Sequence, residues 1–371
     1  MVERFVPSVE PGVVDDLRER IGRTRWPQQP EGLGWELGVD VDYLRGLCEY
    51  WAEGYDFGRL ERIVGEHPNF RWRGVHFIHA RAKEGGDRPA KLPILLVHGW
   101  PGGVIEFSKL IPLLVAAGHD LVVPSLPGYG FSDPLEPPPN TARVATLLGE
   151  LMAELGYERY AAQGGDWGSP ITFHLAHQAP GRVAALHLNA LSVLPAPPDL
   201  NEPPLSPAEQ RFVQAGMRWR IRGGHHLLLH ANAPDAAAVA FGDSPAGLAA
   251  WLIEKYRRWS DRDGEVGRRF SRDDLCDFFT LYWATDTIAS SLRLYWGERH
   301  ERSRLPEGAR VEVPAAIADF PAEIVRAPRE WAERLLADLR RFTEMPRGGH
   351  FAAFEEPQLL ADDVLAFLDG L

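Results

Sequence analysis

The sequence feature that most constrains the fold is the run Gly-Gly-Asp-Trp-Gly at residues 164–168. Small residues on both sides of a central reactive residue are typical of a nucleophile elbow, a tight strand-to-helix turn that lifts the central side chain above the sheet. Residues 160–163 are typical of the end of a buried strand, and residues 169–176 of a helix with proline near its start. The alternative is a glycine-rich turn in which Asp166 only caps the helix.

An aspartate at the elbow limits the chemistry. A carboxylate that attacks an acyl carbon forms an energetic anhydride, whereas attack on a saturated carbon forms an ordinary alkyl ester. Water can hydrolyse that ester in a second step, as in other covalent mechanisms. Asp166 therefore indicates the opening of an epoxide or a haloalkane rather than the cleavage of an ester or a peptide.

Composition and charge exclude several classes of partner. The chain has 371 residues, of which 45% are hydrophobic, and a formal net charge of −12, which argues against nucleic acid and anionic membranes as partners. Cys48 and Cys276 form neither a metal-ligand pattern nor a disulfide framework, so we expect a reducing compartment and no metal. Without a signal-like N-terminus or an apolar run of roughly 20 residues, we expect a cytoplasmic protein and no membrane partner.

Alternating apolar and helical segments predict an α/β fold with a mostly parallel sheet. Residues 1–91 form an N-terminal extension with two predicted helices and one strand-like stretch, at 13–24, 41–54 and 70–79. The core is expected over residues 92–371, with buried strands at 93–97, 119–124, 160–163, 183–188, 311–319 and 339–343, and a final helix.

A helical insertion is predicted between two of the core strands, at about residues 195–304. It begins with a proline-rich break at 195–204, and its position is the usual one for a lid. Ser244 opens a helix that extends to Trp259. Ser271 with Asp274 predicts the cap of another helix, which continues past residue 282 towards Tyr295.

Two further motifs lie in the order that an α/β-hydrolase needs. His-Gly-Trp-Pro-Gly-Gly at 98–103 follows a buried strand, so the backbone N–H groups of Trp100 and Trp167 would form an oxyanion hole. Gly-Gly-His at 348–350 follows the last strand, which makes His350 the candidate general base. A carboxylate should orient this histidine.

The sequence pattern leaves the choice of that carboxylate open. Asp319 and Glu323 both follow the strand that begins at Val311, and either position suits the order nucleophile, acid, histidine.

With these motifs the chain resembles the microsomal-type epoxide hydrolases, the branch that carries an N-terminal meander. The resemblance covers nearly the whole length, and it includes residues 72–79, 98–102, 127–132, 164–168, 243–248 and 347–357. It implies an α/β-hydrolase fold with an N-terminal epoxide-hydrolase meander over residues 1–91, a hydrolase core over 92–371 and a helical lid at about 195–304.

The resemblance also implies roles for individual residues. The family places its relay acid in a Phe-Pro-x-Glu motif, found here at 320–323, which selects Glu323. It uses two lid tyrosines to hydrogen-bond the epoxide oxygen, and the second falls on Tyr295 in the Ser-Ser-x-Arg-x-Tyr context of 290–295.

The first lid tyrosine is missing from this chain. The family has Gly-Tyr where residues 224–226 read Gly-His-His, and the alignment places His226 at the tyrosine position. A charged imidazole donates strongly, so substrate binding by His226 would make ring opening faster on the acid side. Alternatively the lid has repacked and His226 points to solvent.

The implied activity is a cofactor-independent hydrolysis of an epoxide to a vicinal diol through an ester on Asp166. The expected partner is a small-molecule epoxide, and a homodimer is compatible with the sequence. One alternative is a haloalkane dehalogenase-like enzyme, in which Trp100 and Trp167 would present indole N–H groups to a halide. Another is an epoxide-opening cyclase of a biosynthetic pathway. A binding protein without activity would need neither His350 nor its carboxylate partner.

Overall fold

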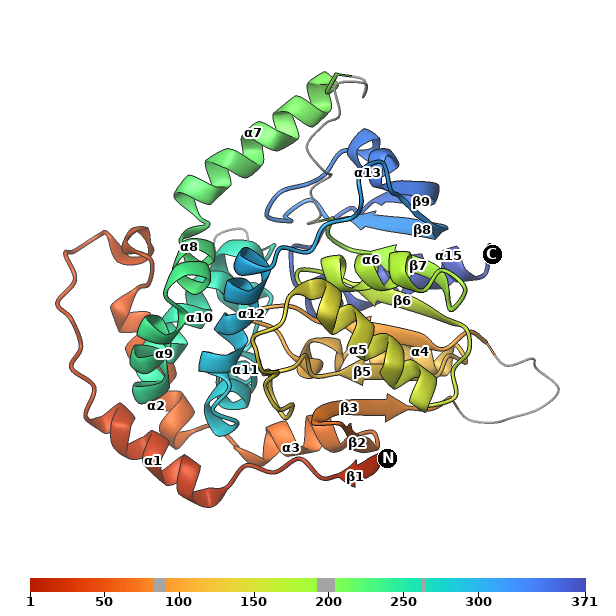
Figure 1. Cartoon of the computed structure of the whole chain (residues 1–371). Helices are drawn as coiled ribbons and strands as arrows, with labels where there is room; N and C mark the ends of the chain where they lie inside the picture. The colour runs from red at the N-terminus through yellow and green to blue at the C-terminus, as the bar shows by residue number, and fades with distance from the viewer. Residues whose placement is uncertain (83–90, 192–203, 262–264) are drawn as a thin grey trace.

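The computed structural model describes residues 1–82, 91–191, 204–261 and 265–371 (Figure 1). Over these ranges nine strands form one sheet, in the order β1-β2-β3-β5-β4-β6-β7-β8-β9. The strands are β1 Glu3–Phe5, β2 Asn69–Trp72, β3 Val75–Ala80, β4 Ile94–Val97, β5 Leu121–Pro124, β6 Tyr160–Gly164, β7 Val183–Leu188, β8 Val311–Asp319 and β9 Leu336–Glu344. Every pairing from β5 to β9 is parallel, whereas β1, β2 and β3 pair antiparallel. The predicted α/β class with a mostly parallel sheet is confirmed.

Helices pack against both faces of this sheet (Figure 1). α5 Thr141–Glu154 and α6 Gly168–Gln178 cover one face, while α4 Ile111–Ala116 and α15 Pro357–Leu368 cover the other. All four residues of β4 are fully buried, as expected for a central strand between two helical layers. Shorter elements complete the core: α13 Arg329–Leu335, α14 Ala352–Glu355 and the 3₁₀ turn Val104–Phe107.

The N-terminal extension contributes strands as well as helices. It contains α1 Pro11–Gly22, a 3₁₀ turn at Gly34–Leu37, α2 Val41–Glu53 and α3 Gly58–Gly65. The stretch 70–79 is a hairpin, not one strand, because Arg73 and Gly74 take φ angles of 49° and 78°. Two consecutive residues with positive φ make a tight turn whose twist suits a hairpin. The hairpin joins the core sheet through β3 and β5, and the division at residue 91 stays a prediction.

Six helices lie between β7 and β8 in the part of the chain that is described. They are α7 Pro207–Arg222, α8 His225–Asn232, α9 Pro234–Asp243, α10 Pro245–Trp259, α11 Arg272–Ala284 and α12 Ile288–His300, with a 3₁₀ turn at Val266–Arg268. Ser244 caps α10 and a reciprocal capping box of Ser271 and Asp274 opens α11, as predicted. Most of the predicted proline-rich break, residues 195–203, lies outside the described ranges.

The single helix predicted from residue 271 towards residue 295 is wrong, because the structure divides it into α11 and α12. Asp286 between them has a φ of 51°, a left-handed conformation that ends a helix. The hydroxyl of Thr285 donates to the carbonyl of Leu281 at 2.6 Å, so short polar side chains compete with the backbone at this point. Among the described residues no single helix is long and apolar enough to cross a membrane, and only the bent pair α9–α10 passes that test jointly.

The N-terminal extension is bonded to helix α11 of the insertion. Trp51 donates its indole N–H to the hydroxyl of Thr280 at 2.8 Å, and the Tyr55 hydroxyl donates to Asp277 at 2.7 Å. Arg59 pairs with the same Asp277 at 2.8 Å, and the carboxylate is buried. The extension therefore lies along the outer side of the insertion and holds it by side-chain hydrogen bonds (Figure 1).

Candidate active site

Asp166 stands on a strained turn between β6 and α6. Its φ is 47°, the left-handed region that non-glycine residues avoid and that a nucleophile elbow imposes on its central residue. Glycines make this geometry possible, since a Cβ on Gly168 would collide with the backbone of Val97. A Cβ on Gly99 would likewise collide with the Asp166 carboxylate. The turn predicted from the sequence is therefore the turn observed.

His350 joins two carboxylates at the carboxyl edge of the sheet. Its Nε2 atom lies 3.2 Å from Oδ2 of Asp166, and its Nδ1 atom lies 2.8 Å from Oε1 of Glu323. Glu323 follows β8 and His350 follows β9, so neighbouring parallel strands deliver both side chains to the same edge. Asp319 faces elsewhere and pairs with Arg326. Of the two candidate acids, Asp319 and Glu323, it is Glu323 that contacts the histidine.

The charge of His350 depends on these two carboxylates. Burial acts to lower the pKa of His350, but the Glu323 carboxylate and hydrogen bonds to Asp166 and Glu323 outweigh it and raise the pKa well above its ordinary value. In the resting protein the imidazole is therefore charged and donates to both neighbours. If the charge on Asp166 disappears, part of this stabilisation disappears with it.

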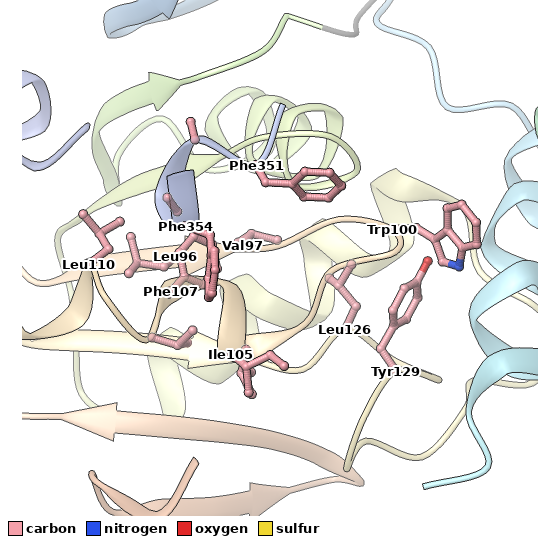
Figure 2. Packing of buried hydrophobic residues seen from close by; sticks show 14 of the residues in the cluster. Leu96, Val97, Trp100, Ile105, Phe107, Leu110, Leu126, Tyr129, Phe351 and Phe354 are labelled. Carbon is pink, nitrogen blue, oxygen red and sulfur yellow. The ribbon is translucent and has the colours of Figure 1, made fainter. Parts of the chain in front are cut away.

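Backbone donors converge on the other side of Asp166. The backbone N–H of Trp100 donates to its Oδ1 atom at 2.8 Å. Trp167 is the N-cap residue of α6, where backbone N–H groups lack partners within the helix and the helix dipole favours negative charge. Figure 2 shows the indole of Trp100 beyond the end of β4, past Leu96 and Val97. Both predicted oxyanion-hole residues lie next to Asp166.

Tyr295 of α12 lies above the elbow. Its ring centroid is 4.7 Å from that of Trp167 and 6.0 Å from that of Trp100, both nearly perpendicular to it. Burial raises the pKa of Tyr295 well above its ordinary value, and the charge of Asp166 acts in the same direction. The phenol therefore stays protonated and can donate a hydrogen bond to an oxygen bound near Asp166.

His226 is buried, so the expectation that it points to solvent is wrong. Its ring stacks on Trp100 with 5.7 Å between centroids and 10° between planes, and its centroid is 5.9 Å from that of Tyr295. Burial lowers the pKa of His226 well below its ordinary value, and the neighbouring His230 adds to this effect. The imidazole is neutral near pH 7, which removes the basis for faster ring opening on the acid side.

Two residues near the site went unnoticed in the sequence. Glu106 lies in the 3₁₀ turn after the glycine-rich loop, where a Cβ on Gly102 would collide with its carboxyl group, and burial raises its pKa to about 8. His230 lies one turn after His226 on α8, with its ring centroid 4.8 Å from that of Tyr295. The spacing of four residues on one helix was a usable signal for His230. The described residues include no group of three or more side chains placed to hold a metal ion.

Sequence comparisons relate this chain to known families. The family model described as epoxide hydrolase N terminus matches residues 2–107, and the model of the alpha/beta hydrolase fold matches residues 93–224. A protein of Stigmatella aurantiaca with the provisional name of an epoxide hydrolase is 42% identical over 97% of this chain and 83% of its own length. Epoxide hydrolase 1 of Sus scrofa is 32% identical over 96% of this chain and 86% of its own length.

A solved structure has a similar fold. The crystal structure of juvenile hormone epoxide hydrolase from the silkworm Bombyx mori has a TM-score of 0.88 to this chain at 30% identity, and the match covers 100% of this chain and 94% of that one. The sheet, the elbow and the order of the site residues along the chain define an α/β-hydrolase. Within that class, the chain belongs to the epoxide hydrolase family.

Proposed function

We propose that this enzyme hydrolyses a small-molecule epoxide to a vicinal diol through an alkyl ester on Asp166. The observation that supports this most strongly is the imidazole of His350 held between Asp166 and Glu323, at 3.2 Å and 2.8 Å. An aspartate at the elbow suits attack on a saturated carbon, and a histidine beside it suits the hydrolysis of the ester that results.

Ring opening is the first step. The Asp166 carboxylate attacks a carbon of the epoxide, the carbon–oxygen bond breaks, and the oxygen leaves as an alkoxide. Tyr295 donates a hydrogen bond to this oxygen as its charge develops. The carboxylate becomes a neutral ester, so His350 loses one of the two anions that raised its pKa. The alkoxide takes up one proton from solvent and His350 releases one proton to solvent, so the step balances in charge and protons.

Ester hydrolysis is the second step. His350, now neutral and oriented by Glu323, accepts a proton from water, and the hydroxide attacks the carbonyl carbon of the ester. The backbone N–H groups of Trp100 and Trp167 stabilise the oxyanion of the tetrahedral intermediate. When that intermediate collapses, the bond from the carbonyl carbon to the substrate oxygen breaks, and this oxygen takes the proton of the new carboxyl group and leaves as the diol. The Asp166 carboxylate is restored and His350 is charged again. The overall reaction consumes one epoxide and one water.

Heavy-oxygen water tests this route directly. With enzyme in excess over epoxide, the first diol should carry no heavy oxygen from water, and the label should appear in the peptide that contains Asp166. This follows because water attacks the carbonyl carbon, and the original carboxylate oxygen leaves with the product. Label in the diol and none in the peptide would show that water opens the epoxide directly, and would overturn the covalent route.

Glu323 should matter far more than Asp319. Replacement of Glu323 by Gln should slow ester hydrolysis, by as much as roughly 10⁴-fold, because the histidine loses the anion that holds its orientation and charge. Asp319→Asn should have a small effect, since Asp319 pairs with Arg326 instead. Single-turnover decay of the ester measures both variants, and the reverse ranking would show that the wrong acid is assigned.

Tyr295→Phe should slow ring opening and leave ester hydrolysis largely unchanged. The phenol acts on the epoxide oxygen and not on the ester carbonyl, so loss of one such donor should reduce the first step on the order of 10²-fold. Stopped-flow tryptophan fluorescence can follow alkylation, because Trp167 lies against the Tyr295 ring. Equal slowing of both steps would indicate a general disturbance of the site.

One observation favours a second candidate reaction. The indole N–H of Trp100 is buried without a hydrogen-bond partner among the described residues, and such a donor could bind a halide. Release of halide from a panel of small haloalkanes would favour haloalkane dehalogenation. The third candidate, an epoxide-opening cyclase, predicts a cyclic ether in place of the diol, so the structure of the product distinguishes it.

A further inference from the structure

His230 lies among the aromatic side chains of Trp100, Trp251 and Tyr295. The residue belongs to α8 and has no exposed surface. Its ring centroid is 4.7 Å from that of Trp100 and 4.8 Å from that of Tyr295, and both rings are nearly perpendicular to it. The histidine therefore contacts both Trp100, whose backbone N–H donates to Asp166, and Tyr295, the proposed donor to the epoxide oxygen.

Trp251 fixes the tautomer of His230. The indole N–H of Trp251 donates to Nε2 of His230 at 3.1 Å. An indole nitrogen can only donate, so Nε2 must present a lone pair, and a neutral imidazole then carries its proton on Nδ1. Burial lowers the pKa of His230 well below its ordinary value, and repulsion from Lys255 and His225 adds to this, so the ring is neutral.

The protonated nitrogen of His230 has no acceptor. Nδ1 is buried and has no hydrogen-bond partner among the described residues. A buried N–H without an acceptor is costly, and in a native structure it calls for an explanation such as a catalytic role. An oxygen atom bound beside Tyr295 would supply the missing acceptor.

His226 differs from His230 in its contacts. Its Nδ1 atom is also buried without a hydrogen-bond partner among the described residues, but none of the hydrogen bonds of these residues fixes which ring nitrogen of His226 carries the proton. Its ring stacks on Trp100 with 10° between planes, whereas the ring of His230 is nearly perpendicular to both Trp100 and Tyr295.

We propose that the Nδ1–H group of His230 is the second hydrogen-bond donor to the epoxide oxygen, opposite Tyr295, in place of the lid tyrosine that this chain lacks. This inference rests on the proposed function and names a further catalytic residue for it. The N–H group donates a hydrogen bond as the carbon–oxygen bond breaks and keeps its proton. His226 stacks on Trp100 and holds the Trp100 ring in place.

Single-turnover kinetics with four variants test the proposal. His230→Leu should slow alkylation of Asp166 on the order of 10²-fold, the usual effect of losing one such donor, while hydrolysis of the ester keeps its rate. His230→Asn places an amide N–H near the position of Nδ1 and should recover part of the loss. Trp251→Phe removes the donor to Nε2 of His230, so the imidazole proton can lie on either ring nitrogen. This variant should slow alkylation less than His230→Leu does. His226→Asn should slow alkylation less than His230→Leu as well.

A direct measurement of the tautomer separates this inference from the proposed function. Nitrogen-15 NMR of the histidine side chains should show His230 protonated at Nδ1 near neutral pH, and the Trp251→Phe variant should lose this preference. A proton on Nε2 of His230 would overturn the inference whether or not the enzyme turns over epoxides. So would alkylation at the wild-type rate in both His230 variants, or a larger loss in His226→Asn. If wild-type enzyme forms no adduct with any epoxide, the proposed function itself fails.

Discussion

The Asp166→Asn enzyme should form no covalent adduct and should turn over epoxide on the order of 10⁶-fold more slowly than wild type. Asparagine keeps the size of the side chain and its place on the elbow, but its amide lacks the negative charge that attacks the carbon. Intact-mass measurement after incubation with excess epoxide checks for the adduct, and diol formation checks turnover.

Two details decide how this result is interpreted. Asparagine on a strained turn deamidates slowly to aspartate, so activity must be measured on freshly prepared protein and followed over time. A slow rise of activity from a very low start would agree with the assignment. Full initial activity in fresh protein would show that Asp166 is not the nucleophile.

The His350→Gln enzyme should be alkylated but unable to release the product. Ring opening needs the Asp166 carboxylate and the donors above it, whereas ester hydrolysis needs a base, and loss of a general base typically slows a step about 10²–10⁴-fold. The ester should therefore accumulate. Mass spectrometry should find the protein heavier by one intact epoxide, located on the peptide that contains Asp166.

The matched control for this experiment is the Glu323→Gln enzyme, which keeps the imidazole but loses its anionic partner at 2.8 Å. It should accumulate the same ester, because loss of Glu323 also slows ester hydrolysis. Wild-type enzyme should show little adduct with the same epoxide. If His350→Gln protein gains no mass from an epoxide that wild type turns over, His350 acts in the first step or in none.

The sequence predicted the framework of the site well, because local chemistry determines it. A glycine-flanked Asp166 after an apolar strand allows few structures other than an elbow, and His350 between a strand and a helix has one natural place at the sheet edge. Glu323 needed more than pattern, since Asp319 at the end of β8 also suits the order nucleophile, acid, histidine. The structure separates them because Arg326 engages Asp319 and leaves only Glu323 within reach of the histidine.

The hydrogen bonds and charges of the histidines on α8 could not be predicted in the same way. Whether His230 offers a proton at Nδ1 depends on the hydrogen bond that its Nε2 atom accepts from Trp251, and this contact joins α8 and α10, which meet only in the folded protein. The pKa values depend on burial, which the sequence of a surface insertion does not reveal. The break between α11 and α12 likewise depends on the backbone conformation of one aspartate.

The hydrogen bonds between the N-terminal extension and α11 determine which segments must be exchanged together in a chimera of this enzyme and a relative. Burial raises the pKa of Asp277 to about 6, against the effect of its hydrogen bonds with Arg59 and Tyr55. A chimera that receives only a foreign N-terminal extension would separate this buried carboxylate from Arg59 and Tyr55, and removing one partner of a buried charge pair costs about 3–5 kcal/mol. Lid and N-terminal extension should therefore be exchanged together, as one cassette drawn from two distant stretches of the gene.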